Sequence, residues 1–161
     1  MKLSSTISLV ACLALMANSS AFTQGKPIQL ALFNPIQIVP EHESISGLRV
    51  SLIYGRNANM TGFDWGLVTS TTGSFTGVQW TFVGLVDQDF EGWQSSFVGI
   101  TNGSFKGLQW GFYNSAGSAN GLQLGFINNA GSMKGIQLGL INIIKRGGFM
   151  PIFPIVNWGG L

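Results

Sequence analysis

The side chains able to do chemistry are few, and the first group is the run Glu41-His42-Glu43, which contains the sole histidine of the chain. An imidazole between two carboxylates can bind a metal or transfer a proton. The run directly follows Pro40 and lies before the first clear strand pattern. We therefore interpret it as an exposed loop without a catalytic or metal-binding role.

A second acidic group, Asp87, Asp89 and Glu91, has the carboxylates of a calcium loop but lacks its glycine-centred spacing. We interpret it as a solvated turn. The sequence has no Gly-x-Ser-x-Gly, no phosphate loop and no Cys/His metal spacing. We therefore expect no enzyme activity and no catalytic residue, metal or cofactor; a carbohydrate-processing enzyme is disfavoured because convergent acids are lacking.

Most of the chain is an internal repeat. Units of fifteen and then fourteen residues open at seven glycines: Gly47, Gly62, Gly77, Gly92, Gly107, Gly121 and Gly135. A fixed period of this kind indicates one structural unit stacked on itself. A catalytic centre, in contrast, needs several unlike groups at one place.

Within each unit the apolar residues alternate with a period of two, which predicts a β-strand. Counting the glycine as position zero, positions one, three and five carry side chains such as Leu108, Trp110 and Phe112. Burial of such side chains is worth about 1.5 to 3 kcal/mol each, so we assign these positions to the core. Trp65, Trp80 and Trp110 would then form a buried stack, and Trp80→Asp would unfold the protein; exposed, the same stack could bind sugars.

Position two forms a polar column whose members are Gln79, Gln94, Gln109, Gln123 and Gln137. A row of amides at coil spacing is a candidate interaction surface for a polymer or another solenoid. The alternative, which we favour, is a ladder in which the amides bond to one another. Arg49 and Asp64 occupy the same column in the first two units and are expected to form a surface ion pair. Asn114, Asn128 and Asn142 close their strands and are expected in turns.

Two architectures fit one strand-and-turn unit per repeat. The first is an all-β solenoid of 14–15-residue coils with proline-containing caps. The alternative is a small up-and-down outer-membrane β-barrel of about eight or nine strands with a channel or anchoring role. Every unit carries the same turn, and positions one to five span only about 15 to 17 Å, against the roughly 25 Å of a lipid-facing band, so we favour the solenoid.

The expected organisation has four parts. Residues 1–21 form a signal peptide with an apolar stretch and a small-residue cleavage site ending at Ala21. Residues 22–46 are an N-terminal cap with a degenerate first repeat, 47–143 the repeat array, and 144–161 a C-terminal cap with a degenerate last repeat. The only cysteine, Cys12, lies in the signal segment, where lipidation is the alternative to simple cleavage.

The repeated phrases resemble a known group of sequences. From Ile28 onward, phrases such as Gly121-Leu-Gln-Leu-Gly-Phe-Ile-Asn128 resemble exported bacterial surface-repeat proteins with G-L-Q-x-G-L-x-N units, a family without an assigned activity. The Gln-x-Gly-x-x-Asn-x-Ala core at Gln109–Ala116 is also similar to curlin repeats, in which Gln and Gly face inward. That orientation would expose the Leu, Trp and Phe columns here.

These features together predict a non-enzymatic exported module with a structural or interaction role at the bacterial cell surface, in the periplasm or at the outer membrane. The formal charge is only +2, and charged residues make up 9% of the chain, so no nucleic-acid partner is implied. The expected partner is a surface ligand or another copy of the chain. Membrane association would require a lipidated Cys12 or the barrel.

Overall fold

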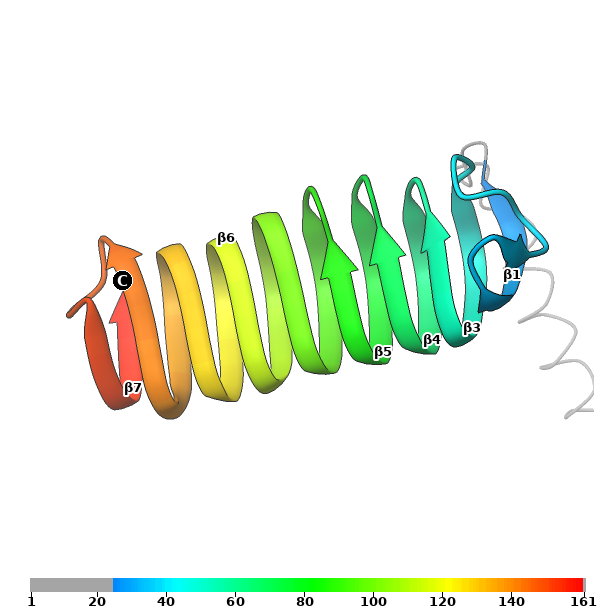
Figure 1. The fold of residues 1–161 in the computed structure, drawn as a ribbon. Coiled ribbons are helices and arrows are strands. Elements are labelled where there is room, and N and C mark those ends of the chain that lie inside the picture. The colour runs from blue at the N-terminus through cyan, green and yellow to red at the C-terminus, as the bar shows by residue number, and fades with distance from the viewer. Residues whose placement is uncertain (1–24, 161) are drawn as a thin grey trace, which may run out of the picture.

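The computed structural model describes residues 25–160, which wind into an all-β solenoid (Figure 1). In chain order the strands are β1 (Lys26–Phe33), β2 (Ile36–Gln37), β3 (Ile45–Asn57), β4 (Met60–Thr71), β5 (Phe75–Val86), β6 (Phe90–Arg146) and β7 (Ile152–Gly159). They form one sheet in the order β2-β1-β3-β4-β5-β6-β7. β6 continues through several coils without interruption (Figure 1). Cys12 and the cleavage site at Ala21 lie outside the described residues.

Neighbouring coils pair in parallel, with each repeat glycine beside the next. Gly47 pairs with Gly62, Gly62 with Gly77, and Gly77 with Gly92. Parallel pairing at a constant offset is the result of stacking one unit by translation. The predicted solenoid is therefore confirmed, and the up-and-down alternative, in which neighbouring strands are antiparallel, is not formed.

The repeat glycines are required by the backbone. All seven have positive φ angles, between 122° and 152°, which side-chain-bearing residues rarely adopt. They also leave no space for a side chain, since a Cβ on Gly107 would lie 2.0 Å from the carbonyl oxygen of Gly92. The period seen in the sequence is thus the period at which one coil crosses closely over the previous one.

The apolar core lies inside the coils, and its largest side chains form a narrow column two residues before each repeat glycine. Phe75, Phe90 and Phe105 are at most 1% exposed. Their rings stack with centroid distances of 4.7 Å between Phe75 and Phe90 and 5.2 Å between Phe90 and Phe105. Ile45 and Met60 extend the column toward the N-terminal end of the array and Met133 toward its C-terminal end, and all three are buried.

The assignment of positions one, three and five to the core is wrong. Their side chains point outward, and Trp80 is 62% exposed and Trp110 56% exposed. Trp65, at 48%, is likewise outside, so the expected buried tryptophan stack does not form. Positions two and four, which alternate with these outward positions, face the interior. This is the orientation that the similarity to curlin repeats implied.

The reason for this inversion is that the interior is only about one side chain thick. The Gln109 side chain reaches across it, with its Nε2 donating to the carbonyl oxygens of Gly99 and Ser115 on the facing wall, both at 3.2 Å. A Cβ on Gly84 would lie 2.4 Å from Oε1 of Gln79. Three columns of Leu, Phe and Trp do not fit this space, whereas slender amides facing small residues do.

The two ends differ from the repeats between them. β1 pairs in parallel with β3, so that Ile28 aligns with Leu48 and Gln29 with Arg49, and β2 pairs antiparallel with β1. β7 runs antiparallel along the last coil of β6, with Asn157 beside Gln137. The C-terminal segment therefore covers the final coil in the reverse direction.

Candidate functional site

The predicted interaction column, Gln79, Gln94, Gln109, Gln123 and Gln137, lies inside the solenoid, and every member is 0% exposed. From Gln94 onward, the amide Nε2 of each member donates to Oε1 of the preceding glutamine at 2.6 to 2.7 Å. Gln79 donates instead to Asp64 at 3.1 Å. The structure therefore has the self-bonded ladder, and the amides present no surface to a ligand. Gln29 in β1, which the column of the prediction did not include, is also buried and donates to Asn57 at 3.2 Å.

A second amide ladder lies on the facing wall. Asn114 donates through Nδ2 to Asn128 at 2.9 Å, and Asn128 donates to Asn142 at 2.8 Å. All three are 0% exposed. The expectation that these asparagines sit in turns is wrong, because they lie within β6, where Nδ2 of Asn114 and Nδ2 of Asn128 also donate to the backbone carbonyls of Leu124 and Leu138 inside the coils.

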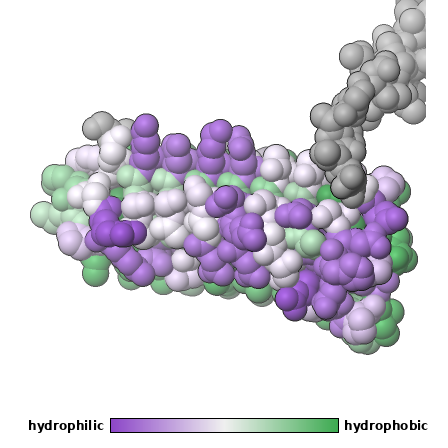
Figure 2. Space-filling view, turned by 90° about the horizontal axis from the view of Figure 1, so that it is seen from above, coloured by the Kyte–Doolittle hydropathy of each residue, from purple (hydrophilic) through white to green (hydrophobic). Residues whose placement is uncertain are grey.

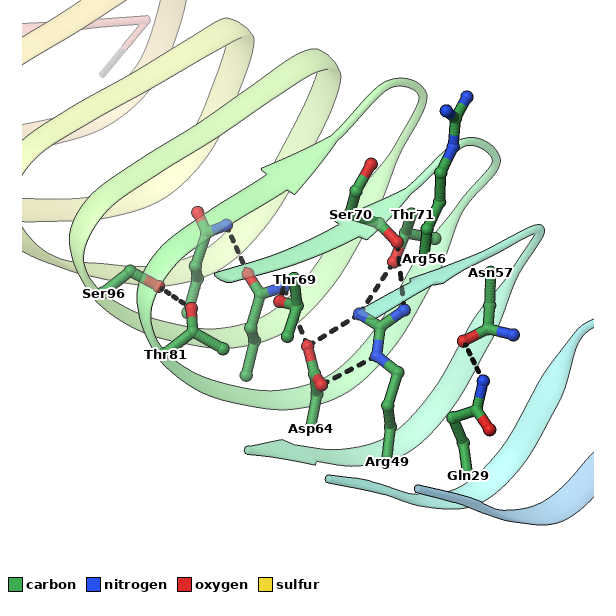
Figure 3. A network of polar contacts seen from close by, with 12 residues as sticks. Gln29, Arg49, Arg56, Asn57, Asp64, Thr69, Ser70, Thr71, Thr81 and Ser96 are labelled. Carbon is green, nitrogen blue, oxygen red and sulfur yellow. Dashed lines mark hydrogen bonds and ion pairs between the residues drawn. The ribbon is translucent and has the colours of Figure 1, made fainter. Parts of the chain in front are cut away.

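The ion pair between Arg49 and Asp64 is buried rather than at the surface, with both side chains 0% exposed. The guanidinium donates to both carboxylate oxygens, from Nε at 2.8 Å and from Nη2 at 2.7 Å (Figure 3). Further donors and acceptors are paired as well: Arg49 reaches Thr71, and Asp64 accepts from Gln79. The pair replaces two rungs of the glutamine ladder and has a structural role.

Breaking the glutamine ladder is expected to be costly. Gln109→Leu keeps a similar volume but leaves Oε1 of Gln94 without its ladder donor and Nε2 of Gln123 without an acceptor. We expect a loss of about 2 kcal/mol or more in the free energy of unfolding, because each buried unpaired group costs about 1 to 3 kcal/mol. Chemical unfolding checks this, with Gln88→Leu on an exposed turn as control. Equal losses in both variants would contradict a stabilising ladder.

The outward side chains of positions one, three and five form one continuous surface, here called the apolar face. None of them is buried. Over the seven coils they are Leu48, Val50, Leu52, Phe63, Trp65, Leu67, Val78, Trp80, Phe82, Trp93, Ser95, Phe97, Leu108, Trp110, Phe112, Leu122, Leu124, Phe126, Ile136, Leu138 and Leu140. Seen from above, hydrophilic residues cover much of the solenoid, and hydrophobic ones come into view along the lower margin and at both ends (Figure 2).

The apolar face is ordered into columns that follow the solenoid axis. The rings of Phe82, Phe97, Phe112 and Phe126 stack in sequence with centroid distances of 4.9 to 5.0 Å and interplanar angles of 1° to 11°. Stacked rings cover one another's flat faces and present their edges outward. A sugar that stacks on a ring face therefore finds little free surface on this column. Ser95 interrupts the tryptophan column, and a shallow pocket of about 300 Å³ lies there between Trp80 and Trp110.

The acidic groups singled out in the sequence lie at the surface and make local contacts. Glu41 accepts a hydrogen bond from Asn34 at 2.7 Å, and His42 beside it is exposed. Asp89 accepts from the backbone N–H of Ser104 at 2.8 Å. Within residues 25–160, no three His, Cys, Asp or Glu side chains are placed to hold a metal ion.

Comparison with models of protein families, with curated proteins and with solved structures finds no match to this chain. In the part of the chain that the structure describes, no helix has the length and apolarity needed to cross a membrane. The candidate site therefore depends on the geometry of the chain itself, and the apolar face is the feature without a partner in the single chain.

Proposed function

We propose that this protein is a non-enzymatic module, exported to the bacterial cell surface, with a structural or interaction role, and that the apolar face is its docking surface. The observation that carries the proposal is the length of this face. It continues through every repeat from Leu48 to Leu140, with no charged residue at its outward positions. Monomeric proteins rarely expose contiguous apolar patches of more than a few hundred Å².

The size of the face supports docking. Coils lie about 4.8 Å apart and five strand residues span about 16 Å, so seven coils with the aligned Ile28–Leu32 segment outline roughly 500 to 600 Å². At about 25 cal/mol per Å², covering it releases on the order of 10 to 15 kcal/mol before the costs of association. The repeating polar side chains, in contrast, are used inside the coils, where they stabilise the stack.

Export and docking are tested together by fractionating a bacterial host that produces the full chain. We expect the protein in the exported fraction and in an assembly larger than one chain. Trp80→Asp should release it from that assembly, whereas Asn120→Asp should not, because Asn120 is exposed beside the face in a column with Lys106 and Lys134. A cytoplasmic protein, or one of single-chain size in all three forms, would contradict the proposal.

The same substitution also tests the position of the face in the fold. Trp80→Asp is expected to remain folded in dilute solution and to lose less than about 1.5 kcal/mol, because its side chain is largely in solvent. Phe90→Asp, which inserts a charge into the buried column, is expected to abolish the fold. Circular dichroism and thermal unfolding of the two variants distinguish these outcomes. Unfolding of Trp80→Asp would indicate that its column belongs to the core.

A further inference from the structure

We infer that the apolar face is covered by the same face of a second copy of this chain, so that two solenoids pack sheet against sheet. This inference rests on the proposed docking function and names its partner. Two faces of roughly 500 to 600 Å² each bury together about 1,000 to 1,200 Å² in outline, which reaches the roughly 1,000 Å² expected of a specific interface. The relief of the side chains adds to this accessible area.

The shape of the face fits a copy of itself. Positions one, three and five form three ridges along the axis, separated by grooves over the inward-facing positions, and both copies repeat at the same coil spacing. Contacts can therefore form at every coil along the array. Two β-sheets whose side chains interdigitate in this way pack about 10 Å apart. The stacked phenylalanine rings, whose edges point outward, supply one such ridge.

The charges around the face favour a protein partner over a lipid surface. The column beside position one, immediately before the repeat glycines, carries both signs, and Glu91 and Lys106 in it form an ion pair at 2.8 Å. The whole chain has a formal charge of only +2. Surface-bound membrane proteins commonly add a cationic rim to their apolar face, and this rim is close to neutral.

The test is sedimentation of the full chain, recovered from the exporting host, over about 1 to 100 µM, together with acrylamide quenching of tryptophan fluorescence. Trp65, Trp80, Trp93 and Trp110 are all half-exposed in the single chain, so pairing should protect them as concentration rises. We expect wild type and Asn120→Asp to form dimers with this protection. Trp80→Asp and Trp110→Lys should require at least about 100-fold higher concentration, because each buries an unpaired charge.

Flotation with phosphatidylcholine vesicles, with and without phosphatidylglycerol, tests the alternative that a lipid bilayer covers the apolar face. Dimers that do not float support the inference. A wild-type monomer over the whole concentration range overturns it, as does undiminished dimerisation of both Trp80→Asp and Trp110→Lys. If that monomer floats and Trp80→Asp does not, the docking function remains and its partner is a bilayer. If the monomer neither pairs nor floats and has single-chain size in cells, the docking function fails as well.

Discussion

Gly107→Ala is expected to destabilise the solenoid by at least about 3 kcal/mol, which is a large fraction of the stability of a small domain. Gly107 has a φ angle of +130°, and an added Cβ would meet the carbonyl oxygen of Gly92 at 2.0 Å and its carbonyl carbon at 3.0 Å. Both obstacles are backbone atoms of the preceding coil. Relief of the contact therefore requires separating two coils and losing their hydrogen bonds.

A matched control for this variant exists in the same chain. Gly147 also has a positive φ angle, +72°, but nothing lies within 4 Å of a Cβ added there. Gly147→Ala should lose no more than about 1 to 2 kcal/mol, the cost of the left-handed conformation alone. Guanidinium unfolding of both variants measures the difference, and equal losses would show that close crossing of the coils does not explain the repeat glycines.

The sequence was sufficient to predict the stacking but not the direction of its side chains. The glycine period gave the parallel register directly, because Gly62 and Gly77 must pair when identical units stack. Alternation with a period of two defines two faces of a strand equally well, and it does not say which one is inside. The apolar-inside rule then selected the wrong face at Trp80 and Trp110, because the thickness of the interior is a property of the folded coil.

Two signals in the sequence bear on the correct orientation. Phe75, Phe90 and Phe105 recur at the repeat spacing, outside the alternating positions, and they supply the apolar core. Arg49 and Asp64 occupy adjacent positions in a column otherwise filled by glutamine. A buried charge requires a partner of opposite charge, and these two residues supply it to each other. Polar side chains that form hydrogen bonds with one another can be buried. The polarity of the glutamine column therefore did not by itself indicate an exposed surface.

The residues of the candidate docking surface were recognised in the sequence, but their exposure on one face of the solenoid was not. The same side chains that were assigned to the core, such as Phe112 and Leu138, became a surface once the direction of the strand was known. The Asn114 ladder was missed for a related reason. Asparagine suits turns, and only the facing wall of the coil, with Asn128 at the adjacent position, gives its amide an interior partner.

Arg49→Gln is expected to lower the free energy of unfolding by about 3 kcal/mol or more, because it leaves the carboxylate of Asp64 buried without its counter-charge. Asp64 would retain the hydrogen bond from Gln79 at 3.1 Å, which is a neutral donor. Both side chains of the native pair are 0% exposed, so water does not compensate the lost charge. Chemical unfolding of the single variant at neutral pH measures this loss.

The double variant Arg49→Gln/Asp64→Gln should recover most of that stability, to within about 1 kcal/mol of wild type, because neutral groups replace a buried ion pair with little penalty. Position 49 lies beside 64, and 64 beside 79, in the parallel register. Two glutamines there would extend the ladder that begins at Gln79. The coupling between the substitutions is then strongly favourable. A double variant as unstable as Arg49→Gln alone would mean that the first coils cannot accommodate the amide ladder and require the ion pair.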